Sequence, residues 1–258
     1  MRMHQLLAPA LLLGGCVAVS QPRPDIGHLY EYVRSNRDGS LPETILIYLP
    51  APDEVEVVKI VAPCTDAAYV TATIDPSIGS AASLVAGRLE KDGGQRRIGA
   101  MTYDKAARTL EFKLGPEGDL SGALNDVARS WHLFDFDFAT LVSDARFRWP
   151  VQEAAAFDLV RLMPTESGDL EFEDLGLVEV TPLSEIQGEM SYSVSGSGLP
   201  DGEMIRRIAD GAIVSISSSE KNHLEYDDFE LRLTDDRPTS RQAWLRRRQG
   251  HWHDCKPG

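Results

Sequence analysis

Apolar and polar residues alternate with a period of two along most of this chain, the pattern of strands that bury one face. In the first half, segments rich in Val, Ile, Tyr, Thr and Phe predict strands at 29–34, 44–49, 55–61, 68–74, 83–89, 97–103 and 109–114. In the second half they predict strands at 157–162, 171–180, 189–195, 204–208, 212–217, 229–233 and 243–247. Short turn clusters such as 91–94 separate these segments, so neighbouring strands should run antiparallel.

The middle of the chain carries helical spacing instead. Residues 120, 124, 127 and 128 are apolar and follow Asp119, and residues 138, 141, 142 and 145 follow Asp137, where each Asp is a candidate N-cap. The fold class is therefore predicted to be mainly β, an antiparallel meander forming a half-barrel or a sandwich, with two short helices inserted mid-chain. A single β-rich domain at 29–258 would hold strands in 29–115, a helical insert at 116–149 and strands in 150–250.

Composition and charge narrow the class of protein. The 258 residues are 42% hydrophobic and 26% charged, as in a folded globular domain. Their 26 Lys and Arg stand against 40 Asp and Glu, a net charge of -14. Because phosphate contacts need a basic surface, nucleic acid is excluded as a partner.

The first residues predict export. An apolar run at 6–13 is too short to span a bilayer and is interrupted by Pro9, as in the apolar region of a secretory signal at 1–15. It ends in LGGC, which resembles the lipobox of bacterial lipoproteins. That resemblance implies that Cys16 carries lipid, that 16–28 form a lipidated tether, and that the membrane is a partner through this lipid. Val17 stands where an inner-membrane retention signal would place Asp, so the resemblance implies an outer-membrane anchor facing the periplasm.

Two cysteines remain after lipidation, Cys64 and Cys255, in a compartment that is oxidising. The economical interpretation is a disulfide between them; two buried free thiols are the alternative.

A long antiparallel meander behind a lipobox resembles the half-barrel lipoprotein carriers and receptors of the bacterial envelope. Residues 220–234, EKNHLEYDDFELRLT, are similar to a terminal hairpin of uncharacterised lipoproteins of this kind. The resemblance implies an architecture and no catalytic motif.

Candidate chemistry competes with structural explanations at each motif. Oxygen-bearing residues at 36–43 lack the spacing of a calcium loop, so a hairpin turn is favoured. Asp135 and Asp137 alternate with Phe, and the acidic residues at 169–173 alternate with Leu170 and Phe172. Both patterns are typical of the solvent face of a strand. A paired-carboxylate hydrolase would need two carboxylates with separated pKa values in one cleft. Ser218 begins an S-x-x-K motif without its partner motifs.

The C-terminal segment combines two further possibilities. His251 and His253 are weak metal candidates, because an H-x-H pair can chelate zinc or copper but no third ligand is identifiable. The prediction is therefore that no metal and no cofactor is bound.

The residues from 239 onward are rich in Arg and contain Trp244 and Trp252. They could rest on anionic lipid headgroups or neutralise the acidic body of the protein.

These observations predict a non-catalytic envelope lipoprotein that acts as a binding or assembly module. Its ligand would be apolar or amphiphilic and held on a concave face, to which Val55, Val57, Lys59 and Val61, or Ile213, Ser215 and Ser217, would contribute. The alternatives are a structural lipoprotein that docks envelope proteins, and a periplasmic hydrolase without a recognisable catalytic motif.

The lipid anchor can be tested first. If Cys16 is the first residue of the mature chain, Cys16→Ser should prevent lipid attachment and release a soluble or uncleaved form, as measured by membrane fractionation and N-terminal sequencing. A processed Cys16→Ser chain that still sediments with membranes would place the anchor elsewhere.

Overall fold

The computed structural model describes residues 26–115, 119–127, 130–165, 169–253 and 255. The predicted signal at 1–15, the predicted lipidation site Cys16 and residues 17–25 of the predicted tether lie outside them. The predicted tether ends earlier than expected, because residues 26–28 belong to the first strand.

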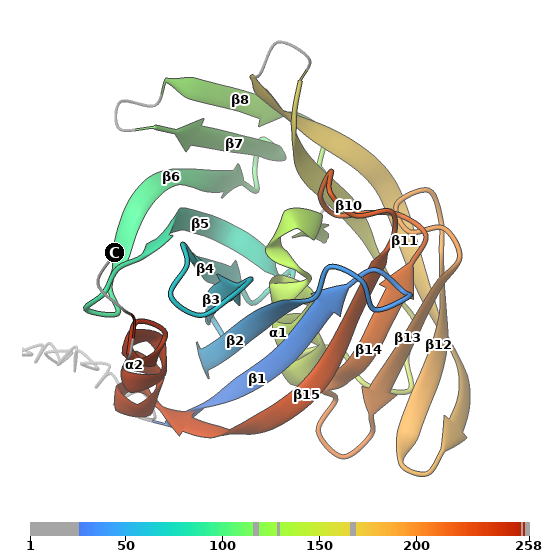
Figure 1. Ribbon diagram of the computed structural model, residues 1–258. Coiled ribbons are helices and arrows are strands. Elements are labelled where there is room, and N and C mark those ends of the chain that lie inside the picture. Colours follow the sequence, from blue (N-terminus) through green and yellow to red (C-terminus); the bar gives the residue numbers. More distant parts are fainter. Residues whose placement is uncertain (1–25, 116–118, 128–129, 166–168, 254, 256–258) are drawn as a thin grey trace, which may run out of the picture.

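A single sheet of fifteen strands makes up most of the described chain (Figure 1). Its order is β8-β7-β6-β5-β4-β3-β2-β1-β15-β14-β13-β12-β11-β10-β9, and each neighbouring pair is antiparallel except β9 and β10, which are parallel. The strands of the first half are β1 (Ile26–Ser35), β2 (Glu43–Ala51), β3 (Glu54–Ile60), β4 (Ala68–Asp75), β5 (Ser80–Leu89), β6 (Gln95–Asp104), β7 (Thr109–Leu114) and β8 (Leu120–Leu124). Those of the second half are β9 (Trp131–Leu133), β10 (Ala155–Pro164), β11 (Leu170–Ile186), β12 (Glu189–Ser195), β13 (Gly202–Arg207), β14 (Ile213–Ser218) and β15 (Phe229–Ser240).

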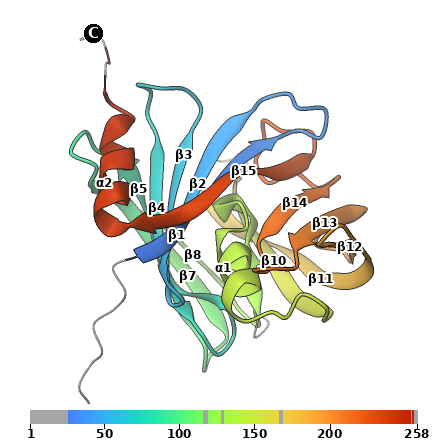
Figure 2. The same ribbon diagram turned by 90° about the horizontal axis from the view of Figure 1, so that it is seen from below.

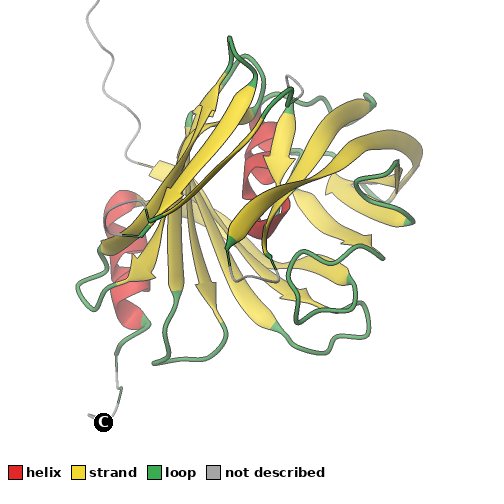
Figure 3. Cartoon of the chain, turned by 90° about the horizontal axis from the view of Figure 1, so that it is seen from above, coloured by secondary structure: helices red, strands yellow, loops and turns green. Residues whose placement is uncertain are grey.

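The sheet curves around a central helix without closing into a barrel (Figures 1 and 3). This confirms the mainly β, antiparallel fold, and of the two predicted arrangements it is the half-barrel, because a sandwich would need a second sheet. Two α-helices are present among the described residues, α1 (Ala139–Phe147) and α2 (Arg241–Gly250), together with the short 3-10 helix η1 (Phe134–Phe136).

The concave face of the sheet is filled by side chains. Helix α1 buries Leu141, Val142 and Ala145, the positions whose spacing predicted it, against the inward residues of the strands. Phe134 and Phe138 pack on Phe229 with ring centroids 5.0 and 5.4 Å apart, and lie 5.0 Å from each other. Most of the concavity is therefore a packed core.

The convex face carries a second apolar cluster under α2, which lies outside the sheet (Figure 2). Trp244 is buried there, with its ring 5.3 Å from that of Tyr48. The prediction of a strand at 243–247 was wrong. Ser240 caps the helix by accepting a hydrogen bond from the Ala243 amide, and the Ala, Leu, Gln and Arg residues that follow are strong helix formers.

The predicted helix at 120–128 is also corrected, since residues 120–124 form the edge strand β8. Leu120 and Leu124 lie opposite Leu114 and Leu110 of β7. A spacing of four residues returns to one face of a strand as well as to one face of a helix, so this pattern did not distinguish the two structures. Only one of the two predicted helices, α1, therefore lies mid-chain.

One of the two strand faces predicted to line the concavity is confirmed. Val55 and Val57 belong to the inner core, and Lys59 is buried beside them, while Val61 lies at the exposed end of the row. The prediction that Ile213, Ser215 and Ser217 share the concave face was wrong. The register between β13 and β14 shifts where Ile205 pairs with Ser215 and Arg206 pairs with Ile213, so Ile216 joins Ile213 in the core and Ser215 and Ser217 do not.

The disulfide predicted from the cysteine count is present between Cys64 and Cys255, whose Cα atoms lie 5.6 Å apart. It joins the 61–67 loop between β3 and β4 to the segment that follows α2. His251 reinforces the same junction through a 2.7 Å hydrogen bond between its Nε2 atom and the Thr65 carbonyl oxygen.

Replacing both cysteines, Cys64→Ala with Cys255→Ala, should lower the free energy of unfolding by up to about 5 kcal/mol, because the bridge closes a loop of 191 residues in the unfolded chain. Urea unfolding of the variant beside the oxidised parent measures this loss. The parent treated with reductant is the control and should unfold at the same urea concentration as the variant. An unchanged unfolding midpoint in both would contradict the prediction.

Candidate functional site

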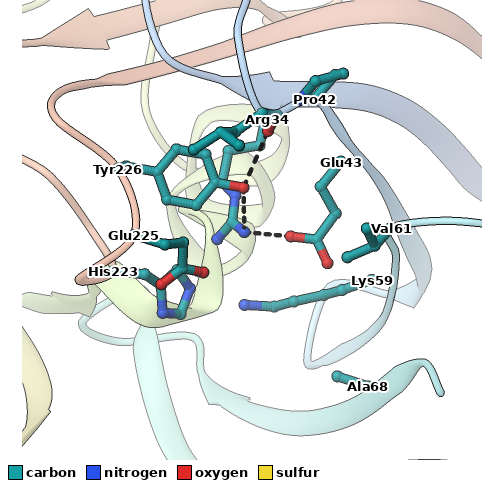
Figure 4. A pocket seen from close by; sticks show the side chains of 10 residues that line it. Arg34, Pro42, Glu43, Lys59, Val61, Ala68, His223, Glu225 and Tyr226 are labelled. Carbon is teal, nitrogen blue, oxygen red and sulfur yellow. Dashed lines mark hydrogen bonds and ion pairs between the residues drawn. The ribbon is translucent and has the colours of Figure 1, made fainter.

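A cavity of about 380 Å³ opens at the end of the half-barrel where β1 ends and β2 begins (Figure 4). Its walls come from four separate stretches of the chain, which contribute Arg34, Leu41, Pro42, Glu43, Lys59, Val61, Ala68, His223, Glu225 and Tyr226. We call this space the polar cavity, because Arg34, Glu43, Lys59 and His223 approach one another in it. Leu41 and Val61 keep 51% and 71% of their surface exposed and form an apolar rim.

The floor beside this cavity is organised by Asp137, which follows η1. Asp137 and Phe138 both adopt left-handed backbone conformations, with φ angles of 49° and 56°. This sharp turn lets Phe134, Phe136 and Phe138 all enter the core, and it leaves the Asp137 carboxylate inside the protein, fully buried. A non-glycine residue in this conformation is uncommon, so the surrounding contacts must hold it in place.

Three side chains from distant segments bind the Asp137 carboxylate. Oδ1 accepts hydrogen bonds from Arg34 at 3.0 Å and from the Asn222 amide at 2.7 Å. Oδ2 forms an ion pair with the Lys59 ammonium group at 2.6 Å. Burial on its own would raise the pKa of Asp137, but Arg34 and Lys59 together outweigh it and lower the pKa to about 2. Removing one partner from such a buried pair typically costs about 3 to 5 kcal/mol.

Arg34 connects this floor to the wall of the cavity. Its guanidinium donates to Glu43 and, over 2.9 Å, to the Tyr226 hydroxyl, and it lies 4.4 Å from the centre of the Tyr226 ring. The Tyr226 hydroxyl in turn donates to the Leu41 carbonyl oxygen at 3.1 Å. Burial raises the pKa of Glu43, although the Arg34 charge opposes this shift. The ion pair therefore also anchors the apolar rim.

Asp135 occupies a different environment two residues before Asp137. Its Oδ2 accepts a 2.6 Å hydrogen bond from the Leu162 amide, and its backbone carbonyl accepts one from Lys59. Burial raises the pKa of Asp135 to about 7, while burial and the nearby Lys59 charge lower the pKa of His223 to about 3. The Asp135 Oδ1 and His223 Nδ1 atoms are 3.8 Å apart. The neutral His223 ring thus faces the cavity beside a carboxyl group that titrates near neutrality.

The two carboxylates therefore have separated pKa values, as acid–base catalysis would require. Their accessibility differs, however. Asp137 is fully buried and both of its oxygens are occupied, so it cannot reach a substrate, whereas Asp135 keeps part of its side chain exposed. This arrangement supports charge pairing and ligand binding better than hydrolysis by a pair of carboxylates.

The structure places the other sequence candidates away from this site. Asn36 donates to the Ser40 hydroxyl over 2.8 Å within a turn, as expected for a hairpin, and Glu43 is the one oxygen-bearing side chain of 36–43 that lines the cavity. Ser218 donates to the Pro200 carbonyl oxygen at 2.9 Å. Glu173 pairs with Arg161 on the outer side of β11, as the strand interpretation predicted.

His251 and His253 are not brought to a metal-binding arrangement with other side chains. In the described ranges no group of three His, Cys, Asp or Glu residues is close enough to hold an ion. His251 instead bonds to Thr65, and His253 is exposed.

The arginines of α2 are largely paired within the protein. Arg241 bonds to Glu54 at 2.6 Å, Arg247 to Glu31 at 3.0 Å, and Arg248 lies 3.6 Å from Glu56. Of the two explanations for the basic C-terminal segment, these pairs support internal neutralisation. A search of the described helices for a membrane-crossing segment finds none with the necessary length and apolar character.

Sequence reasoning placed Lys59 on the concave row at 55–61 without assigning it a partner, and it did not identify Arg34, Asn222, His223 or Tyr226 as site residues. One signal was available: Lys59 occupies an inward position of a strand whose other inward residues are Val55 and Val57. A buried lysine in such a row requires a carboxylate nearby to balance its charge, and here that carboxylate comes from the turn between η1 and α1. The 220–234 segment, noted for its similarity to envelope lipoproteins, supplies His223, Glu225 and Tyr226.

Comparison with known proteins adds little. No family model and no curated protein matches the chain. One solved structure that resembles it is a domain from Vibrio parahaemolyticus named for outer membrane lipoprotein sorting; it is 12% identical, with 87% of this chain and 90% of that chain covered, at a TM-score of 0.15. A similarity this low supports no argument, so the functional interpretation rests on the geometry of this chain.

The titration of Asp135 gives a measurable consequence. Because its pKa of about 7 lies above that of an ordinary Asp, near 4, the folded chain holds a proton that the unfolded chain has released. This contribution to stability is present at low pH and is lost as the pH rises through about 7. Asp135→Asn stays neutral, so between pH 5 and pH 8 its free energy of unfolding should rise by about 3 kcal/mol relative to that of the parent.

Urea unfolding of the parent and Asp135→Asn across this pH range measures the difference. Other titrating groups, including His223, contribute to both proteins and largely cancel. Glu171→Gln, which removes a charge on the exposed side of β11, is the matched control. A difference that is the same at pH 5 and pH 8 would show that Asp135 is not the titrating group.

Proposed function

We propose that this protein is a lipid-anchored envelope protein whose half-barrel binds an amphiphilic ligand, and that it is not an enzyme. Export and anchoring are supported by the signal-like run at 1–15 and the lipobox-like LGGC that ends at Cys16. The proposed location is the outer membrane, on the periplasmic side.

The polar cavity is the observation that carries the proposal. With about 380 Å³, it is within the size range of small-molecule sites. Its apolar rim at Leu41 and Val61 offers surface whose burial would provide affinity. Its polar wall offers Glu43, His223 and Glu225 as groups that would orient a ligand headgroup. A molecule with one apolar and one polar part matches both surfaces.

The position of the cavity relative to the anchor favours exchange of a ligand between the cavity and the periplasm. β1 enters the sheet at Ile26, opposite Ser240, whereas Arg34 lies near the other end of the same strand, opposite Glu43. A strand rises about 3.4 Å per residue, so these two ends are about 27 Å apart. The cavity thus opens at the end of the half-barrel away from the point where the tether enters, and a soluble envelope component could reach it.

A docking function for protein partners is the main alternative. Leu183 and Ile186, in the second half of β11, are 65% and 66% exposed, but they are far fewer than a stable protein interface needs. The polar cavity is the more specific feature, because it combines buried charge and apolar surface around a recess of about 380 Å³.

The binding proposal is tested with a dansyl-labelled fatty acid, whose fluorescence reports transfer from water to an apolar site. The protein is the full-length Cys16→Ser chain, so that neither attached lipid nor detergent competes. Saturable binding is expected, and Val61→Glu at the rim should weaken it at least tenfold, because a charge replaces apolar contact surface.

Leu183→Glu is the matched control, since Leu183 is exposed to a similar degree as Val61 but belongs to β11 and does not line the cavity. It should bind the probe like the parent chain. Absence of saturable binding, or an equal loss in the two variants, would reject the polar cavity as an amphiphile site and leave partner docking as the better explanation.

A further inference from the structure

A second cavity, of about 140 Å³, lies on the concave side of the sheet below η1. We call it the apolar cavity. The strands β5 to β7 supply Leu84, Ala86, Met101 and Phe112, and Leu162 of β10 closes the opposite side. Its other lining residues are apolar as well, with the exception of Asp135. A space lined in this way gains little from holding water, which needs two to four polar partners.

The apolar cavity is separated from the polar cavity by a few side chains. Ala68 lines the polar cavity and Val70 lines the apolar one, and these residues are two positions apart on the same face of β4. Lys59 and His223 belong to the first cavity, and both approach Asp135, which belongs to the second. The boundary between the two spaces is therefore formed by Lys59, Asp135 and His223.

We propose that the apolar cavity is a second subsite of the same binding site and receives the apolar end of the ligand, a single ring or an unbranched chain of about six carbons. This inference rests on the proposed function and specifies its ligand class. The size follows from the volume, because a dry apolar cavity of about 150 Å³ is known to hold benzene. The ligand would then be a short-chain or single-ring amphiphile.

The boundary can open without losing a hydrogen bond. Asp135 Oδ1 and His223 Nδ1, at 3.8 Å, are too far apart to form one. The other contacts of Asp135 use different atoms: Oδ2 binds the Leu162 amide, and the backbone carbonyl binds Lys59. A ligand chain that passes between the Asp135 carboxyl and the His223 ring would leave those contacts intact.

The packed core sets the upper limit of ligand length. Beyond the apolar cavity the concave face is filled by α1 and by the stack of Phe134, Phe138 and Phe229. These residues are fully buried, and displacing them would open a core that is stabilised by several kcal/mol per aromatic side chain. A lipid with two long acyl chains does not fit this interior.

The proposal is tested by competition against the dansyl-labelled fatty acid, with unbranched alkyl chains of four to twelve carbons. One series carries a carboxylate head and another an ammonium head, because the chain-length limit does not depend on the charge of the head. Each added methylene should raise affinity about fourfold, until about six carbons are buried. Longer chains should then show no further gain.

Two variants make the test specific. Ala86→Leu fills the apolar cavity and should bring the plateau to shorter chains, whereas Leu162→Ala enlarges it and should move the plateau to longer ones. Ala123→Leu makes the same chemical change on the exposed side of the edge strand β8 and should leave the profile of the parent unchanged.

The outcomes separate this inference from the binding proposal. Failure of the dansyl probe itself to bind rejects the proposed function. If the probe binds, the inference is overturned by affinity that rises evenly up to twelve carbons, by no displacement in either series, or by a plateau that neither Ala86→Leu nor Leu162→Ala shifts.

Discussion

The buried carboxylate of Asp137 is the constraint on which the open end of this half-barrel depends. A charge without access to water requires partners of opposite charge or hydrogen-bond donors. Here they come from β1, β3 and the segment between β14 and β15, in the form of Arg34, Lys59 and Asn222. Elements far apart in the chain are thereby held at one point beside the left-handed turn that precedes α1.

The same network shapes the candidate site. Arg34 and Lys59 each extend from Asp137 to a second group, Glu43 in one case and the Asp135 backbone in the other. Both cations are therefore largely satisfied within the protein, while Glu43, Glu225 and the His223 ring still face the polar cavity. One cluster of residues thus supplies both the interactions that stabilise the fold and the surface that is offered to a ligand. A substitution in this cluster would be expected to change both stability and binding.

The two α-helices cover opposite faces of the sheet. Helix α1 fills much of the concavity, and both the polar cavity and the apolar cavity lie on the side of the turn that precedes it. Helix α2 covers the convex face through Trp244, and the Cys64–Cys255 disulfide at its end restrains the 61–67 loop. Val61 begins that loop, Ala68 follows it, and both line the polar cavity, so the bridge restrains one wall of the site as well as the terminus. A rigid wall favours binding, since less ordering is needed when a ligand arrives.

The local alternation of apolar and polar residues was sufficient to predict most strands of the sheet. Period-two alternation is imposed by the pleat itself, so segments such as 44–49 and 68–74 could be assigned without knowing their neighbours. The pairing of Cys64 with Cys255 was predicted from the number of cysteines and the expected oxidising compartment, and it is present. Local pattern was ambiguous where four-residue spacing fits both a strand and a helix, as at Leu120 and Leu124. It also missed a short C-terminal helix with a single buried residue, Trp244.

The site itself was decided only by tertiary structure. Arg34, Lys59, Asp137 and Asn222 come from separate segments, and Arg34 and Asp137 are 103 residues apart. On its own, Asp137 has the alternation of a solvent-facing residue, since it stands between phenylalanines like Asp135. Its burial follows from the turn after η1, which sends the phenylalanines on both sides into one core and leaves the carboxylate no route to water. The alternation of residues determined which segments became strands, because that depends on neighbours in sequence; the partners of the buried charges depend on which strand ends meet in space.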